Sequence, residues 1–182
     1  MKRFRLFTGL MFLLLLAVPA FAVSPDWRKA LDARTALIWV DGQVLGTMVL
    51  NARASLFVTW LPRSLLDRLY QDREVDEWVV KGVSFYSSLD EETRAKMKGR
   101  DILALNYSTR KSWTFDTTEL VIGDYRVSPD DILGNPALRG PTGDLSSGVE
   151  GTLFICVPSL KPGRSVRIAI GPDSVTLELP KR

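Results

Sequence analysis

Histidine is absent from the 182 residues of this chain, and cysteine occurs once, as Cys156. The lack of histidine excludes histidine-based catalytic triads, imidazole acid–base chemistry and histidine metal ligands. A single cysteine cannot form a disulfide within the chain. Because Cys156 lies between Ile155 and Val157 in an apolar run, we expect a buried, inert thiol. A reactive or intermolecular thiol is the alternative.

The first 22 residues have the layout of an export signal. Residues 1–5 carry three basic side chains, residues 6–18 are almost wholly apolar, and Ala20-Phe21-Ala22 places small residues where a signal peptidase cuts. This layout predicts a secretory signal peptide over residues 1–22, and hence a periplasmic or extracellular protein. The alternative is an uncleaved anchor, although the apolar run is shorter than the roughly 20 residues of a spanning helix.

Net charge is also absent once this segment is removed. It holds three of the 24 basic residues and none of the 21 acidic ones, so residues 23–182 carry 21 of each sign. A neutral chain gives no electrostatic reason to bind nucleic acid or an anionic membrane. We expect residues 23–182 to form a single β-rich domain, because their number suffices for one core and no break in composition divides them.

Strand patterns are clearest in the last third of the chain. Residues 166–170 and 175–179 alternate apolar and polar side chains, which is typical of strands buried on one face. Residues 153–157 are apolar at every position, as expected of a central strand. Turn formers at Pro162-Gly163 and at residues 171–174 separate the three. The pattern predicts an antiparallel meander whose apolar face is covered by earlier parts of the chain.

The earlier chain adds short strands and three short helices. Helices are expected at about residues 24–33, 62–72 and 88–98, the last opened by a capping box from Ser88 to Glu91. Asp41-Gly42 is a hairpin signal between the first two strands. The predicted fold class is mainly β, α+β by content: an antiparallel immunoglobulin-like β-sandwich with two or three short peripheral helices. The expected strands are residues 36–40, 44–50, 56–60, 78–86, 102–107, 112–115, 119–122 and 125–127.

No group of residues has a catalytic or metal-binding signature. The acidic run Asp90-Glu91-Glu92 lies in the first turn of an expected helix, where carboxylates are favoured anyway. Ser159 and Lys161 flank a surface turn, where nothing would activate the serine as a nucleophile. Asp124, Asp130, Asp131 and Asn135 lack the spacing and central glycine of an EF-hand calcium loop. We therefore expect no enzyme, no metal and no cofactor.

Two features remain as candidates for binding. Residues 135–150 form a long irregular segment rich in glycine, proline and serine, for which a functional and a disordered state are both open. Most of the five tryptophans are expected in the core, with Trp60 and Trp78, at the ends of elements, the most exposed. The residues expected to contact a partner are Leu138, Arg139, Asp144, Trp60 and Trp78.

The sequence thus predicts an exported, non-catalytic binding or assembly module of the bacterial cell envelope. Such a module would act on another envelope protein through a β-sandwich surface or an edge strand. A carbohydrate-binding module is one alternative, and a hydrolase based on Ser159 and Lys161, or on carboxylates, is the other. No nucleic acid and no integral membrane span after signal cleavage are expected, and the oligomeric state is left open.

Overall fold

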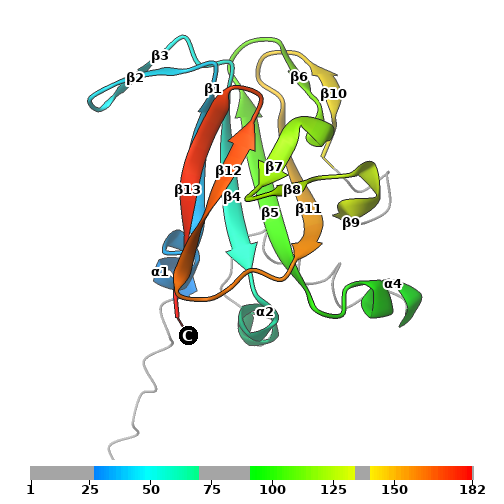
Figure 1. Ribbon diagram of the computed structural model, residues 1–182. Coiled ribbons are helices and arrows are strands. Elements are labelled where there is room, and N and C mark those ends of the chain that lie inside the picture. Colours follow the sequence, from blue (N-terminus) through cyan, green and yellow to red (C-terminus); the bar gives the residue numbers. More distant parts are fainter. Residues whose placement is uncertain (1–26, 70–90, 134–139, 182) are drawn as a thin grey trace, which may run out of the picture.

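The computed structural model describes residues 27–69, 91–133 and 140–181 (Figure 1). The expected signal peptide, the extended segment at residues 78–86 and the start of the capping box at Ser88 lie outside them. Within the described part the chain is mainly β, and every strand pair is antiparallel. The strands form two larger sheets and two small two-stranded ones.

The first larger sheet has the strand order β1-β4-β5-β11-β9. β4 (Ala54–Leu61) pairs over its full length with β5 (Arg100–Thr109), and β11 (Glu150–Pro158) pairs with β5 on the opposite side. β1 (Thr35–Val40) and β9 (Ile132–Leu133) are the two edges. β11 is therefore an inner strand, which explains why residues 153–157 are apolar at every position.

The second larger sheet has the order β13-β12-β7-β8. Its strands are β13 (Asp173–Leu179), β12 (Arg164–Ile170), β7 (Leu120–Ile122) and β8 (Tyr125–Arg126). The predicted pairing of the last two strands is confirmed. The predicted three-stranded meander is wrong, because β11 pairs with β5 and β9 while β12 pairs with β7. The chain passes from one sheet to the other between β11 and β12.

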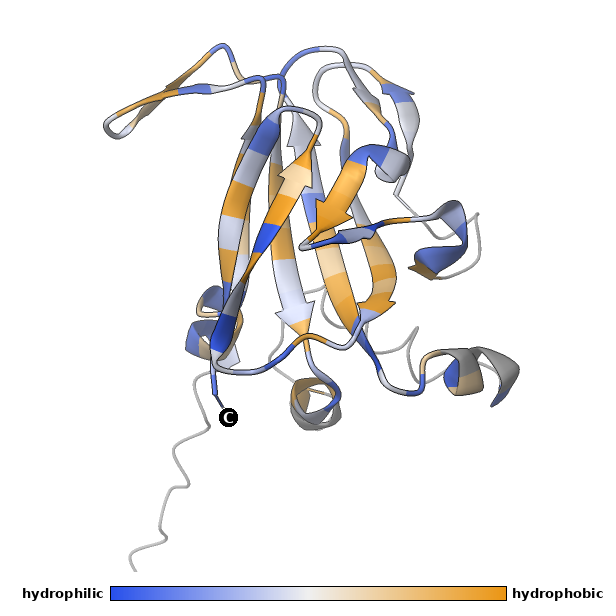
Figure 2. Ribbon diagram, viewed as in Figure 1, coloured by the Kyte–Doolittle hydropathy of each residue, from blue (hydrophilic) through white to orange (hydrophobic). Residues whose placement is uncertain are grey.

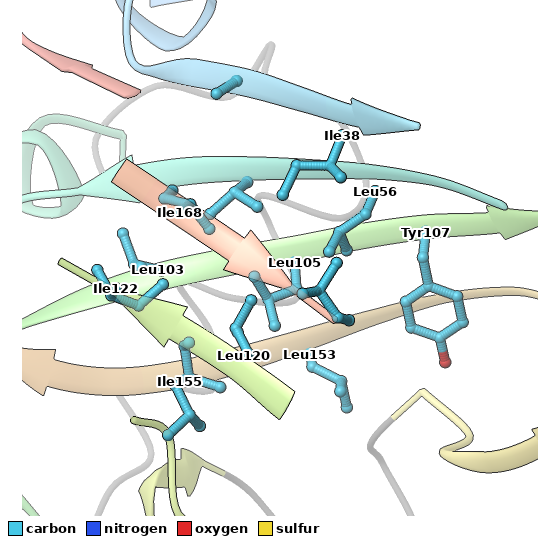
Figure 3. Packing of buried hydrophobic residues seen from close by; sticks show 14 of the residues in the cluster. Ile38, Leu56, Leu103, Leu105, Tyr107, Leu120, Ile122, Leu153, Ile155 and Ile168 are labelled. Carbon is cyan, nitrogen blue, oxygen red and sulfur yellow. The ribbon is translucent and has the colours of Figure 1, made fainter. Parts of the chain in front are cut away.

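Side chains from both larger sheets meet in one hydrophobic core (Figure 3). Leu105 and Ile155 of the first sheet, and Leu120 and Ile168 of the second, have no exposed surface. Each such burial contributes about 1.5–3 kcal/mol relative to an exposed side chain. The sheets cannot separate without exposing this core, so their relative position is fixed by apolar packing.

In the described part of the chain, three short α-helices lie at the end of the first sheet opposite the hairpin of β2 (Gln43–Leu45) and β3 (Met48–Leu50) (Figure 1). They are α1 (Trp27–Asp32), α2 (Arg63–Leu69) and α4 (Glu91–Lys96), in agreement with the predicted helices where the structure describes them. Leu31, Leu65 and Leu66 form a second apolar cluster with Ala104 and Cys156. Cys156 is buried as expected, and that burial raises the pKa of its thiol.

Two other predictions need correction. Residues 44–50 are not one strand but a hairpin of β2 (Gln43–Leu45) and β3 (Met48–Leu50), which turns at Gly46 with φ +62°. Asp41-Gly42 therefore closes no hairpin, and β1 pairs with β4 instead. The predicted irregular segment at 135–150 contains β10 (Gly143–Leu145), which pairs with β6 (Trp113–Phe115).

Tyr107 holds the segment that leads into β10. Its hydroxyl donates a hydrogen bond to the carbonyl of Pro141, and its ring packs edge-on against Trp113 and Phe115. A Cβ atom added at Gly151, which lies opposite Tyr107 in the ladder, would lie 2.1 Å from that hydroxyl. Only glycine leaves room for the ring there, so the side chain of Tyr107 fixes the backbone on both sides of β10.

Truncation of a core leucine tests the shared core. Leu105→Ala is expected to lower the free energy of unfolding by about 2–5 kcal/mol, because the surrounding side chains of two sheets cannot close the cavity. Leu45→Ala is a matched control, since Leu45 is 55% exposed, and it should change stability by less than about 0.5 kcal/mol. Urea unfolding of both variants measures the difference; equal losses would contradict a single core between the sheets.

The environment of Tyr107 predicts a distinct alkaline titration. Burial raises the pKa of Tyr107 to about 12, so one of the four tyrosines should ionise well after an ordinary phenol of pKa 10. The neutral form therefore stabilises the fold fully below pH 10, and this contribution is lost as the pH rises towards 12. Ultraviolet difference titration should show a late phase whose amplitude Tyr107→Phe reduces, with the remainder from Tyr125, whose pKa is raised by its hydrogen bond to Asp131; an unchanged titration curve in that variant would contradict the assignment.

Candidate functional site

The hairpin of β2 and β3 projects from one end of the molecule (Figure 1). Most of its residues are hydrophobic (Figure 2), and four of them have large exposed side chains: Val44 and Met48 are each 60% exposed, Leu45 55% and Leu50 42%. No residue from Gln43 to Leu50 carries a charge. Large apolar side chains that gather on an exposed element usually mark an interaction site, whereas single exposed ones are ordinary. The hairpin is therefore the first part of the candidate site.

Both faces of the hairpin are apolar. Val44 lies opposite Val49 in the ladder, and Leu45 lies opposite Met48. Because successive residues of a strand point to opposite faces, these two pairs lie on opposite sides of the hairpin. A hairpin that only covered its own domain would have one polar face. This one has apolar groups for contacts on two sides.

The two roots of the hairpin have an unusual backbone. Asp41 (φ 52°) precedes β2 and Asn51 (φ 61°) follows β3, and these are the only non-glycine residues with positive φ in the described part. Asp and Asn tolerate this conformation better than other side chains. The Nε of Arg53 donates to Oδ2 of Asp41 at 2.7 Å, and the amide of Asp41 donates to Oδ2 of Asp173 at 2.7 Å. These bonds join the first root to Arg53, two residues after the second root, and to Asp173 of β13.

A groove of about 490 Å³ lies beside these roots. Its apolar lining consists of Val40, Trp113, Leu145 and Ile170, which come from four different strands of the described chain. The turn Gly171-Pro172 between β12 and β13 closes one side. The groove is therefore formed where the ends of both larger sheets meet the β6–β10 pair.

The charged lining of the groove is mainly acidic. Asp41, Glu119 and Asp144 contribute three carboxylates, and Arg53 contributes the one basic side chain among the lining residues. Arg53 is paired with Asp41 at 2.7 Å, and its Nη1 donates to the carbonyl of Ser112 at 3.0 Å. Asp144 accepts a hydrogen bond from the hydroxyl of Thr114 at 2.7 Å. The lining thus has an excess of negative charge, although the chain after residue 22 is neutral by composition.

The structure places the predicted partner-binding residues very differently. Asp144 is exposed and lines the groove. Trp60 is only 2% exposed, and its indole donates to Oδ2 of Asp101 at 3.1 Å, so the expectation that it is exposed is wrong. The error arises because Trp60 precedes the end of β4 and its side chain points into the core cluster. Leu138, Arg139 and Trp78 fall in parts of the chain that the structure leaves undescribed.

The sequence prediction missed the hairpin, although a signal was present. Residues 43–50 lack any charge and are apolar at adjacent as well as alternate positions. Such a run predicts a strand covered on both faces, whereas the glycine at its centre is the signal for a turn. What the sequence does not show is that no other described strand pairs with this run.

The residues considered for catalysis do not come together. Ser159 and Lys161 are both exposed on the connection between β11 and β12, and no hydrogen bond joins their side chains. Within residues 27–69, 91–133 and 140–181, no three cysteine or carboxylate side chains cluster as metal ligands do. None of the helices in the same ranges is long and apolar enough to cross a membrane.

An ionic network at the start of β5 joins the half-buried Arg100 to the buried Asp131. Nη2 of Arg100 donates to Oδ1 of Asp131 at 2.7 Å and to the carbonyl of Cys156 at 2.6 Å. Oδ2 of Asp131 accepts from the hydroxyl of Tyr125 and from the amide of Ser128. These bonds close a capping box on the 3₁₀ helix η2 (Pro129–Asp131) and tie it to the first sheet.

This network predicts a loss of stability in acid. Burial would raise the pKa of Asp131, but hydrogen bonds from Tyr125, Ser128 and Arg100 outweigh it and hold the pKa below 3.8. The carboxylate therefore stabilises the fold fully above that value, and less as the pH falls through the lowered pKa. Asp131→Asn should cost about 2–3 kcal/mol at neutral pH, since charge-assisted bonds are lost.

The difference in unfolding free energy between the two proteins should shrink as the pH is lowered to about 3. Denaturant unfolding across that range measures it. Asp130→Asn is a matched control because Asp130 is exposed and should change stability little. A difference that stays constant with pH would contradict the role given to the Asp131 carboxylate.

Comparison with known proteins gives no relative for this chain. No protein-family model, no curated protein and no solved structure matches it. A proposal for the function must therefore be based on the hairpin and the groove.

Proposed function

We propose that this protein is an exported, non-catalytic binding or assembly module of the bacterial cell envelope. Its binding surface is the β2–β3 hairpin together with the groove at the hairpin roots. The single observation that supports this most strongly is the exposure of four large apolar side chains on one projecting hairpin. Export through the signal peptide at residues 1–22 and a periplasmic or extracellular location belong to the same proposal.

The β-sandwich is the scaffold that we propose for this surface. The five-stranded and four-stranded sheets share one apolar core, and β1 of the first lies beside β13 of the second (Figure 1). In a sandwich the strand connections gather at the two ends, as binding loops do in immunoglobulin-like domains. The hairpin and the groove are at one such end, where a rigid core supports them.

The exposed apolar side chains on both faces of the β2–β3 hairpin favour binding of a protein partner over a purely structural role of the hairpin. A lone two-stranded hairpin is marginally stable in water, and its outer edges have unpaired backbone groups. Among the described strands, β2 and β3 pair only with each other. A partner that adds a strand to an edge satisfies those groups, and its side chains cover the apolar faces.

Site-specific photo-crosslinking in the producing cells tests this function. A photoreactive residue at Met48 is expected to give a defined adduct with an envelope protein, because the side chain of Met48 is exposed on the hairpin. The same residue at Ser159, which is exposed on the connection from β11 to β12, is the matched control and should give none. The proposal fails if Met48 gives no adduct, or if both positions give the same adducts.

A substitution on the hairpin should abolish the adduct without unfolding the domain. Val44→Ser removes an exposed side chain, so we expect the stability of the domain to change by less than about 0.5 kcal/mol. The yield of the Met48 adduct should fall several-fold, because an apolar contact with the partner is lost. Phe57→Ser, which removes a 42% exposed ring from β4, should leave the yield unchanged.

A further inference from the structure

Because the groove opens at the hairpin roots, a partner on the hairpin can continue into it. Val40, Asp41 and Arg53 line the groove, and the same residues precede β2 or follow β3. The backbone there is held by the amide of Arg53, which donates to the carbonyl of Val40 at 2.9 Å. Hairpin and groove therefore form one continuous surface with a fixed junction.

The charges of the groove select the chemistry of its occupant. Arg53 is neutralised by Asp41, which leaves Glu119 and Asp144 as exposed carboxylates without an ion pair to a described basic side chain. The groove floor between them is apolar, with Trp113 and Leu145 buried. A complementary occupant has basic groups for the two carboxylates and apolar groups for the floor.

The strands around the groove select the shape of the occupant. β10 has Asp144 at its centre and pairs only with β6 among the described strands, so each strand of this pair has an outer edge. The same is true of the hairpin on the other side of the roots. Edges of this kind bind extended segments through backbone hydrogen bonds, while alternate side chains of the segment enter the neighbouring surface.

We infer that the hairpin and groove bind an extended segment of a partner protein in which lysine or arginine alternates with apolar residues. This inference rests on the function proposed above and names the partner's chemistry. The charges of the surface argue against two other occupants, an anionic lipid and a second copy of this chain. Carboxylates in the groove repel anionic lipid head groups, and the hairpin of a second copy has no basic side chain to offer Glu119 and Asp144.

Binding of defined peptides to the purified protein tests the inference. The probe is a labelled peptide of about ten residues in which lysine and valine alternate, long enough to span about 33 Å when extended. A second peptide has glutamate in place of lysine. By fluorescence anisotropy the lysine peptide should bind at least about tenfold more tightly than the glutamate peptide, and its affinity should fall as salt rises.

Isosteric neutralisation locates the site. The double variant Glu119→Gln, Asp144→Asn removes both charges and keeps an oxygen that can accept the Thr114 hydrogen bond, so the fold should be unaffected. The lysine peptide should bind this variant about tenfold more weakly. Asp124→Asn with Glu178→Gln neutralises two exposed carboxylates outside the groove and should change the affinity by less than about twofold.

Several outcomes overturn the inference. They are failure of the lysine peptide to bind, equal binding of both peptides, and equal loss of affinity in the two double variants. Co-sedimentation with anionic vesicles that Val44→Ser abolishes would assign the hairpin to lipid instead. A concentration-dependent dimer that Val44→Ser dissociates would assign it to a second copy.

Failure of this inference is distinguishable from failure of the proposed function. If the Met48 adduct persists when Glu119 and Asp144 are neutralised, the partner is not a basic segment, yet the module still binds it. If Met48 forms no adduct in any variant, the binding function itself is wrong.

Discussion

Apolar packing between the two larger sheets is the constraint on which the rest of this structure depends. β5 lies at the centre of the first sheet, and Leu105 on it contacts the same core as Ile168 of the second sheet. Once those residues are packed, the strand ends are fixed in space. The groove is a product of this packing, because its lining comes from strands that the core holds at set distances.

The β2–β3 hairpin differs from this core because its apolar side chains are exposed. Its residues are as apolar as those of a buried strand, but they project into solvent from roots that are held in place. Asp41 is central to that support, because it pairs with Arg53 through its side chain and with Asp173 through its amide. A backbone conformation unfavourable for most residues is retained at both roots, as is common where a structure positions a functional element.

The sequence predicts a strand well where apolar and polar residues alternate strictly, because this pattern is typical of a strand with one buried face. β12 and β13 alternate strictly, and their pairing follows from one short turn. The sequence does not predict which strands share a sheet. β11 pairs with β5, which lies more than forty residues earlier in the chain, with Thr152 opposite Asn106. Nothing local in residues 153–157 indicates which distant strand supplies the neighbour. Long-range pairing of this kind is decided by the packing of the whole core.

The candidate site could be predicted only in part for the same reason. The irregular surroundings of Asp144 point to a binding residue, but the groove that Asp144 lines is assembled from the separate strands β1, β6, β10 and β12. Trp60 was expected at the surface because it is near the end of a strand. Its indole instead donates to the half-buried carboxylate of Asp101, and this hydrogen bond allows the large aromatic ring to be buried.

The contact between Tyr107 and Gly151 links two positions that lie far apart in the chain. The phenol ring fills the volume that any β-carbon at position 151 would need. During evolutionary divergence, a larger residue at position 151 therefore requires a smaller one at position 107, whereas position 107 can become smaller while glycine is kept at 151. Among related sequences, a residue larger than glycine at position 151 should therefore occur together with a residue smaller than tyrosine at position 107.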